Sequence, residues 1–147
     1  MDYRLKAIDK LRHIREYEAA YKVRLDKLRE LDEQLKALKI PSPKSDPVHG
    51  GGTKVEERWL NLIAEKGEVQ DEEFEHTKRR VKRFNTAWAA LSERDKRVLT
   101  LWYIEKYRGD KAQIVADELK IARCTAFNYR DEALENFALA YYGAVKT

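Results

Sequence analysis

The sequence predicts an all-α protein in which a long antiparallel helical hairpin, or coiled coil, precedes a three-helix helix-turn-helix domain. Charged residues make up 38% of the 147 residues, and six glycines and three prolines are few, which is typical of long helices. Apolar residues repeat in heptads over the first part of the chain, and the last third carries two helical patterns joined by a short turn. We therefore expect the hairpin at residues 1–91 and the helix-turn-helix domain at 92–147.

The first predicted helix covers about 38 residues from the N-terminus, because its apolar residues alternate steps of three and four and so form one stripe. The stripe consists of Leu5, Ile8, Leu11, Ile14, Tyr17, Tyr21, Leu25, Leu28, Leu31, Leu35 and Leu38. At 1.5 Å per residue this helix would be roughly 57 Å long, too long to be covered by a compact domain of this size. The stripe therefore needs a partner helix.

A connector and a second long helical span follow. All three prolines and three of the six glycines lie within residues 39–54, so we expect a flexible connector there. Helical spacing resumes at Val55 and continues to Leu91. Gly67 disfavours a helix interior by about 1 kcal/mol and Asp71 could cap a new helix, so the span is one helix or two in line. We favour one helix, folded back on the first.

The C-terminal domain opens with Ser92 and Asp95, an N-cap and an acidic residue at the spacing of a capping box. The helix that follows should end near Lys106, and its core face consists of Val98, Leu99, Trp102 and Tyr103. Asp110 is the expected N-cap of the next helix, with Gln113 three residues on. Three helices therefore occupy residues 92–143.

The last two of these helices form a predicted helix-turn-helix. The first helix ends around Leu119, Lys120–Ala122 make the turn, Ala116 lies where the helices cross, and Ile121 fills the corner. The buried face of the second helix consists of Ala126, Tyr129, Ala133, Leu134, Phe137, Ala138 and Tyr141. These constraints are steric, so they fit a DNA-binding unit and also a tight helical corner that binds nothing.

The order LSERDKRVLTLWY followed by IVADELKIARCTAFNYRDEAL is similar to region four of bacterial sigma factors and related regulators. The matching residues are Leu91, Val98, Leu99, Leu101, Tyr103, Val115, Ala116, Leu119, Ile121, Thr125, Ala133 and Leu134. With its N-terminal coil, a connector containing a PVxGG-like segment (Pro47, Val48, Gly50, Gly51) and a second helix, the whole chain resembles the ArpU/RinA-type late transcription regulators of phages and prophages in Gram-positive bacteria. The resemblance implies a sequence-specific double-stranded DNA-binding regulator, a late-gene activator.

Three features depart from the sigma pattern. The loop between Tyr103 and the Val115–Ala116 pair is about three residues longer than in the sigma pattern. Lys120 stands where the turn often has glycine, and Ala122 replaces the usual Ser or Thr N-cap of the recognition helix. Losing that cap costs about 1 kcal/mol. The apolar frame is unchanged.

The sigma pattern implies which residues face the DNA groove. They are Arg123, Cys124, Thr125, Phe127 and Asn128, with Arg130 and Asp131 one turn on; Lys111 is a further candidate DNA contact. Arg123 can donate to guanine O6 and N7 or bind a phosphate, Asn128 can pair with adenine, and Phe127 and the Thr125 methyl can touch thymine methyls. Alternatively, Arg123 is solvated, Asn128 is merely exposed and Phe127 belongs to a protein interface.

Candidate phosphate contacts are Lys78, Arg79, Arg80 and Lys120. The first three belong to the run KRRVKR, Lys78–Arg83, which is either a solvated face of the coiled coil or a DNA contact. The net charge of +4, from 30 basic and 26 acidic residues, is compatible with a polyanionic partner.

Other classes of protein find little support. His13, His49 and His76 are widely spaced and form no metal-ligand set, and Cys124 has no neighbouring histidine to activate it. We therefore expect no catalysis, metal or cofactor. One cysteine excludes an internal disulfide, and without a signal peptide or an eighteen-residue apolar run we expect a soluble protein of the host bacterial cytoplasm that does not enter membranes.

Two functional classes remain. The first is a transcription regulator that binds double-stranded DNA, with the hairpin as the surface for homo-dimerisation or for contact with the host RNA polymerase. The second is a phage DNA-packaging subunit, like a small terminase, or a coiled-coil scaffold. Oligomeric state distinguishes them, because a dimer favours the regulator and a ring of many subunits favours packaging.

Overall fold

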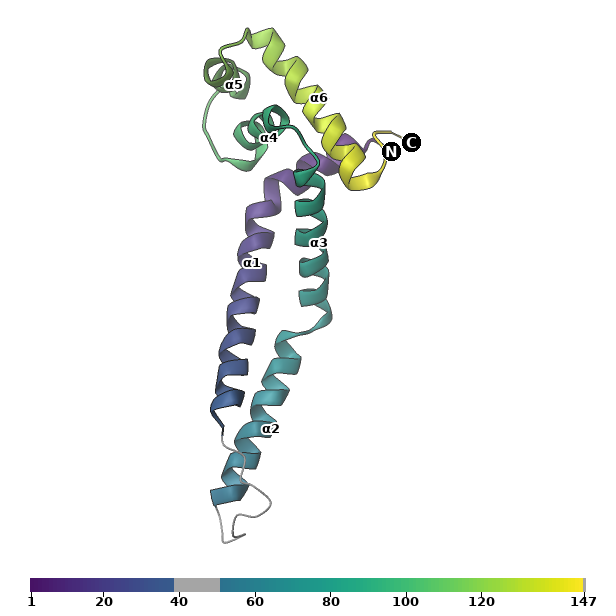
Figure 1. The fold of residues 1–147 in the computed structure, drawn as a ribbon. Helices are drawn as coiled ribbons and strands as arrows, with labels where there is room; N and C mark the ends of the chain where they lie inside the picture. Colours follow the sequence, from purple (N-terminus) through teal and green to yellow (C-terminus); the bar gives the residue numbers. More distant parts are fainter. Residues whose placement is uncertain (39–50, 147) are drawn as a thin grey trace. The chain divides into compact units, whose positions relative to one another are not determined.

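The computed structural model describes residues 1–38 and 51–146, and its elements are all helical (Figure 1). They are α1 (Tyr3–Ala37), α2 (Gly51–Val69), α3 (Glu72–Ala89), α4 (Glu93–Leu99), the π-helix η1 (Thr100–Ile104), α5 (Lys111–Leu119) and α6 (Arg123–Tyr142). The described residues contain no strand, only an isolated bridge between Asp2 and Lys146. The predicted all-α fold with a long N-terminal helix is confirmed.

The chain forms two compact units. The first consists of Met1–Glu18 with Arg79–Thr147, and the second of Ala19–Lys78. This division cuts across the predicted ranges 1–91 and 92–147. The first turns of α1 and the last turns of α3 belong with the C-terminal helices because they share one hydrophobic core with them.

The second unit is an antiparallel helical hairpin. As the residue number rises along α1, the number of its partner falls, which defines the antiparallel direction. The pairs are Tyr21 with Phe74 (ring centroids 5.7 Å apart), Arg24 with Asp71 (N–O distance 2.6 Å) and Asp32 with Lys66 (2.7 Å). The buried residues between the helices are Leu28, Leu31, Leu62 and Phe74. The heptad stripe thus finds a helical partner over this part of the chain.

The span that was expected to be a single helix is two helices, so that prediction is wrong. Gly67 is accommodated within α2, and the break comes at Gln70 and Asp71. The Asp71 carboxylate accepts a hydrogen bond from the Phe74 N–H at 2.8 Å and one from Arg24 at 2.6 Å. These two bonds lower the pKa of Asp71 and fix it as the cap of α3. The break between α2 and α3 therefore lies at the side-chain cap Asp71 and not at Gly67.

The predicted connector ends earlier than expected. α2 begins at Gly51, so residues 51–54 are helical; residues 39–50 of the connector lie outside the described part of the chain.

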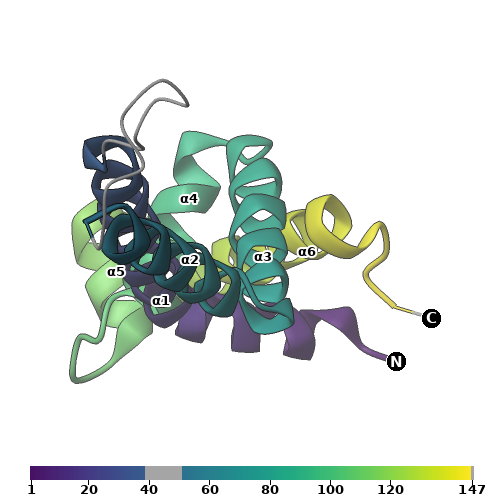
Figure 2. The ribbon, with the colours of Figure 1, turned by 90° about the horizontal axis from the view of Figure 1, so that it is seen from below.

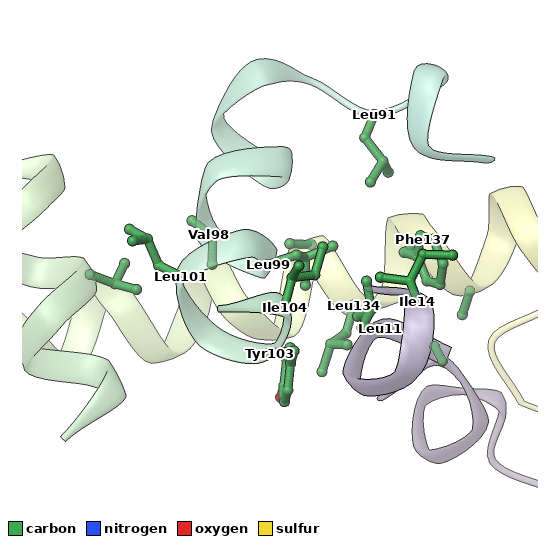
Figure 3. Packing of buried hydrophobic residues seen from close by; sticks show 14 of the residues in the cluster. Leu11, Ile14, Leu91, Val98, Leu99, Leu101, Tyr103, Ile104, Leu134 and Phe137 are labelled. Carbon is green, nitrogen blue, oxygen red and sulfur yellow. The ribbon is translucent and has the colours of Figure 1, made fainter. Parts of the chain in front are cut away.

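The core of the first unit is built by helices from both ends of the chain. Figure 3 shows Leu11 and Ile14 of α1 beside Leu134 and Phe137 of α6, and all four are buried. Phe84 of α3 packs on Phe137 with ring centroids 5.4 Å apart. The first apolar residues of α1 therefore complete the core around α6. Leu5, which was expected on the same stripe, is 68% exposed.

The chain changes from α-helical to π-helical winding after α4, and this change determines which of the following side chains face the core. The Glu105 N–H bonds the Thr100 carbonyl at 2.8 Å, five residues back, which is the π-helical pattern. The predicted α-helix to Lys106 is therefore wrong beyond Leu99, and the π-helix ends at Ile104. The wider turn buries Leu101, Tyr103 and Ile104 and leaves Trp102, an expected core residue, half-buried.

The two ends of the first unit meet at the end of α6. The Tyr3 N–H donates to the Val145 carbonyl at 3.0 Å, and the rings of Tyr3 and Tyr142 lie 5.1 Å apart. Figures 1 and 2 both show the termini side by side there. Gly143 caps the C-terminal end of α6, and its left-handed φ of 75° favours glycine.

Candidate nucleic-acid interface

Helices α5 and α6 form the predicted helix-turn-helix, with the predicted caps. Ser92 Oγ accepts from the Asp95 N–H at 3.2 Å at the start of α4, and Asp110 Oδ1 accepts from the Gln113 N–H at 3.3 Å at the start of α5. The Asp95 carboxylate does not complete a capping box, because it accepts from Asn136 Nδ2 of α6 at 2.8 Å instead. That bond ties α6 to α4.

The turn between α5 and α6 spans Lys120–Ala122. Lys120 adopts the left-handed conformation with φ of 57°, and the Ile121 N–H bonds the Ala116 carbonyl at 3.0 Å. Ala116 is buried and Ile121 is half-buried, as expected for the crossing and the corner. Ala122 gives α6 no side-chain cap. A lysine in a glycine conformation and an uncapped α6 are two local costs that the packing of the helices must offset.

The first two turns of α6 present polar side chains to solvent. Arg123, Cys124 and Asn128 are exposed and Thr125 is half-buried, whereas Ala126 of the same turns is fully buried in the core. Asp131, one turn further, is exposed as well. The structure therefore brings most of the predicted base-reading residues onto one accessible stretch of helix.

Arg123 is held in place by Asp110, a pairing that the sequence did not predict. Its Nε and Nη2 both lie 2.9 Å from Asp110 Oδ2. Desolvation raises the pKa of Asp110, but hydrogen bonds from Arg123 and from the Gln113 N–H outweigh it, so the pKa is lowered overall. Asp110 thus caps α5 and orients the first side chain of α6. A ligand that binds Arg123 would have to offer a hydrogen-bond acceptor in place of the Asp110 carboxylate.

Phe127 lies in an aromatic and cationic cluster that we call the Trp102 cluster, formed by Trp102, Arg123, Phe127 and Arg130. The Trp102 and Phe127 rings meet edge to face with centroids 5.5 Å apart. The Arg130 guanidinium lies 4.9 Å from the Trp102 ring and 5.3 Å from the Phe127 ring, and Arg123 lies 5.0 Å from Phe127. Such contacts favour a fixed position for a cation over an aromatic face.

The π-helix explains why Trp102 reaches this cluster. In an unbroken α-helix Trp102 would share the core face of Val98 and Leu99, whereas the wider turn leaves it half-buried against α6. Sequence periodicity therefore missed Trp102 as a neighbour of the candidate site.

The predicted phosphate contacts have different surroundings. Lys120 is exposed at the turn, while Lys111 is half-buried and its Nζ donates to the Tyr107 carbonyl. Arg79 and Lys78 are exposed, and within the described residues neither forms an ion pair; Lys78 belongs to the second unit. Arg80 lies over the Tyr17 ring at 5.3 Å.

Two further kinds of feature are absent from residues 1–38 and 51–146. No group of three or more His, Cys, Asp or Glu side chains in these ranges is arranged to hold a metal ion. None of the helices there combines the length and apolar character that crossing a membrane requires.

Comparison with known proteins gives one match. The family model described as "Protein of unknown function (DUF1492)" matches residues 37–138, which run from the end of α1 into α6. No curated protein and no solved structure matches the chain. The match includes both the α2–α3 segment and the helix-turn-helix, so these two parts belong to one family pattern.

Proposed function

This chain belongs to the family of proteins of unknown function DUF1492, and we propose that it is a sequence-specific double-stranded DNA-binding transcription regulator that acts on late genes of a phage or prophage. The observation that carries the proposal is the exposed start of α6 behind a tight three-residue turn. Arg123, Cys124 and Asn128 are accessible there, while Ala126 and the rest of the helix face anchor α6 in the core. A rigid helix with free polar side chains at its N-terminal end suits insertion into the major groove.

In this proposal the first turns of α6 read base edges. Arg123 exchanges Asp110 for guanine O6 and N7, to which a guanidinium can donate two hydrogen bonds, and Asn128 pairs with adenine N6 and N7. Because Asp110 already restricts the Arg123 side chain, little side-chain entropy is lost on binding. Lys120, Lys111 and Arg79 supply sequence-independent attraction to phosphates.

We further propose that the regulator binds as a homo-dimer. A single recognition module buries roughly 600–1,000 Å², whereas specific complexes usually bury more. The second unit carries a surface suited to pairing, because α2 exposes Trp59, Leu60 and Ile63, which share one side of the helix at steps of three and four. Symmetric pairing would place two recognition helices about 34 Å apart, or a multiple of that distance. Contact with the host RNA polymerase is the alternative source of added affinity.

The decisive experiment is selection of bound sequences from a random duplex pool with the full chain. We expect a motif of two half-sites in phase with the DNA helix. A pool that yields no motif, together with a ring of many subunits in light scattering, would contradict the regulator and favour the packaging subunit.

Two substitutions of Arg123 then separate the reading of bases from sequence-independent attraction to phosphates. Arg123→Ala should weaken binding to the selected site by about 1–3 kcal/mol and relax one base position. Arg123→Lys keeps the charge but loses the two-pronged donor, so it should also relax that position. Arg79→Ala is the control, and it should weaken selected and random duplexes alike while reducing the salt dependence. If Arg123→Lys binds the selected site as tightly as the unaltered protein, Arg123 contacts a phosphate.

A further inference from the structure

A cleft lies at the opposite end of α6 from the candidate base-reading residues. Its volume is ≈ 590 Å³, and it belongs entirely to the first unit. Its walls come from the first turns of α1, from α3 and from the last turn of α6, and its polar lining is formed by Lys6, Asp9, Lys10, Arg80, Arg83, Tyr141 and Tyr142. This volume is in the range of sites for small molecules.

The charge of this cleft is unbalanced. Four of its lining residues are cations and one, Asp9, is an anion. None of the four cations forms an ion pair within the described residues, and Asp9 contacts His13 at 3.4 Å. Several other arginines of the same unit have carboxylate partners; Arg15, for example, bonds Glu105 at 2.8 Å. The lining of the cleft therefore carries an excess of positive charge.

Two of the cations share one aromatic ring. Lys10 Nζ lies 5.9 Å from the centre of the Tyr17 ring, and the Arg80 guanidinium lies 5.3 Å from it. Partial burial and the repulsion of Arg80 both lower the pKa of Lys10. Two like charges held at one ring favour an anion beside them, because its charge offsets their repulsion.

The remaining wall is rigid. Arg83 donates from Nε and Nη2 to the Tyr141 carbonyl at 3.1 and 2.8 Å, and its guanidinium packs 4.5 Å from the Tyr141 ring. It therefore neutralises the C-terminal end of α6 and holds that end against α3. Tyr142 has a buried hydroxyl without a hydrogen-bond partner in the described residues, and desolvation, followed by the nearby Tyr141, raises its pKa to about 12. A buried donor that lacks an acceptor is unusual in a native fold.

The duplex read by α6 does not fill this cleft. Tyr142 follows Arg123 by 19 residues, which is about 28 Å along the helix at 1.5 Å per residue. The major groove is only about 12 Å wide and 8.5 Å deep. A helix inserted by its first turns leaves its last turn well outside the groove.

We propose that this cleft binds a small phosphate-bearing molecule, whose phosphate oxygens accept hydrogen bonds from Lys6, Lys10 and Arg80. Phosphate suits these groups because lysine and arginine are its usual partners and because several oxygens can be shared among three donors. The tyrosine rings give the cleft an apolar wall for the rest of the ligand. This site is separate from the proposed DNA-reading function and does not depend on it.

The test uses the full chain without DNA and inorganic pyrophosphate as the probe. Pyrophosphate is titrated at constant ionic strength, with sodium chloride as the matched salt, while amide NMR signals are followed. We expect saturable shifts at residues around Lys10, Arg80 and Tyr142. Shifts that are equally large with chloride, or that centre on Arg123 and Lys120, would overturn the proposal.

Substitutions complete the test. Lys10→Gln and Arg80→Gln should each weaken pyrophosphate binding at least about tenfold, since each removes a charge-assisted hydrogen bond. Lys82→Gln is the matched control, because Lys82 is exposed on the same helix as Arg80 and does not line the cleft. An equal loss with Lys82→Gln would mean that pyrophosphate follows net charge, and the cleft would not be a site. Unchanged circular dichroism and unchanged duplex binding by Lys10→Gln would separate this result from any failure of the DNA-binding proposal.

Discussion

Replacing Asn136 by alanine should destabilise the helix-turn-helix unit, although Asn136 itself lies on the exposed side of α6. Its Nδ2 donates to Asp95 Oδ2 at 2.8 Å, and Asp95 is only 2% exposed. The other oxygen, Asp95 Oδ1, has no hydrogen-bond partner within the described residues and lies 3.6 Å from an Arg94 nitrogen. Within the described residues, Asn136 is thus the only side chain that donates a hydrogen bond to the buried Asp95 carboxylate.

The expected magnitude follows from these contacts. A hydrogen bond to a charged group contributes about 1.5–3 kcal/mol, and an unsatisfied buried charge costs at least as much. Alanine is the better helix former by up to roughly 0.7 kcal/mol, which opposes the loss. We therefore expect Asn136→Ala to lower the free energy of unfolding by about 1–2.5 kcal/mol.

The control is Asn128→Ala, the same substitution on the same helix at an exposed position without a hydrogen-bond partner in the described residues. It should leave stability unchanged or raise it slightly, because only helix propensity changes. Urea unfolding followed by circular dichroism gives the free energies. Hydrogen exchange of the α6 amides locates the loss, with the amides of α2 as the internal reference. If the two variants are equally stable, the Asp95–Asn136 bond does not hold α4 and α6 together.

The remaining predictions concern the turn and the pairing surface. Lys120→Gly should stabilise the unit by roughly 0.5–1 kcal/mol, because glycine adopts the left-handed conformation without the penalty of a side chain. Ala122→Ser should raise the free energy of unfolding by about 1 kcal/mol, because serine can cap α6. If thermal unfolding shows no gain in stability from either substitution, Lys120 and Ala122 do not destabilise the turn. If the protein forms the proposed dimer through α2, Leu60→Glu should yield a monomer in sedimentation, since Leu60 is 59% exposed on α2. Leu139→Glu is the control, because Leu139 is a 51% exposed leucine of α6, and it should leave the oligomeric state unchanged. If the two variants sediment alike, α2 does not form the dimer interface.

Features that depend on neighbours a few residues apart could be predicted from the sequence. The caps at Ser92 and Asp110, the turn at Lys120–Ala122 and the buried face of α6 lie where the sequence placed them, except that Tyr129 of that face is only half-buried. Their interactions close within one helical turn or follow from helical periodicity, so no distant residue is needed to define them. The exposed positions of Arg123, Cys124 and Asn128 follow from the same periodicity, and their contact with DNA remains a prediction.

Features that depend on competition between distant groups were decided only by the tertiary structure. Leu11 and Ile14 continue the heptad of the hairpin, yet they complete the core around α6, because a heptad defines a stripe without saying what covers it. The π-helix moves Trp102 out of the core and onto Phe127, since one wider turn shifts every later side chain. The sequence places Arg80 in a basic run that is either solvated or a DNA contact, whereas the structure places both Arg80 and Lys10 beside the Tyr17 ring. Local sequence determined where most helices lie and the caps at Ser92 and Asp110, and burial against residues far along the chain determined which faces remained exposed.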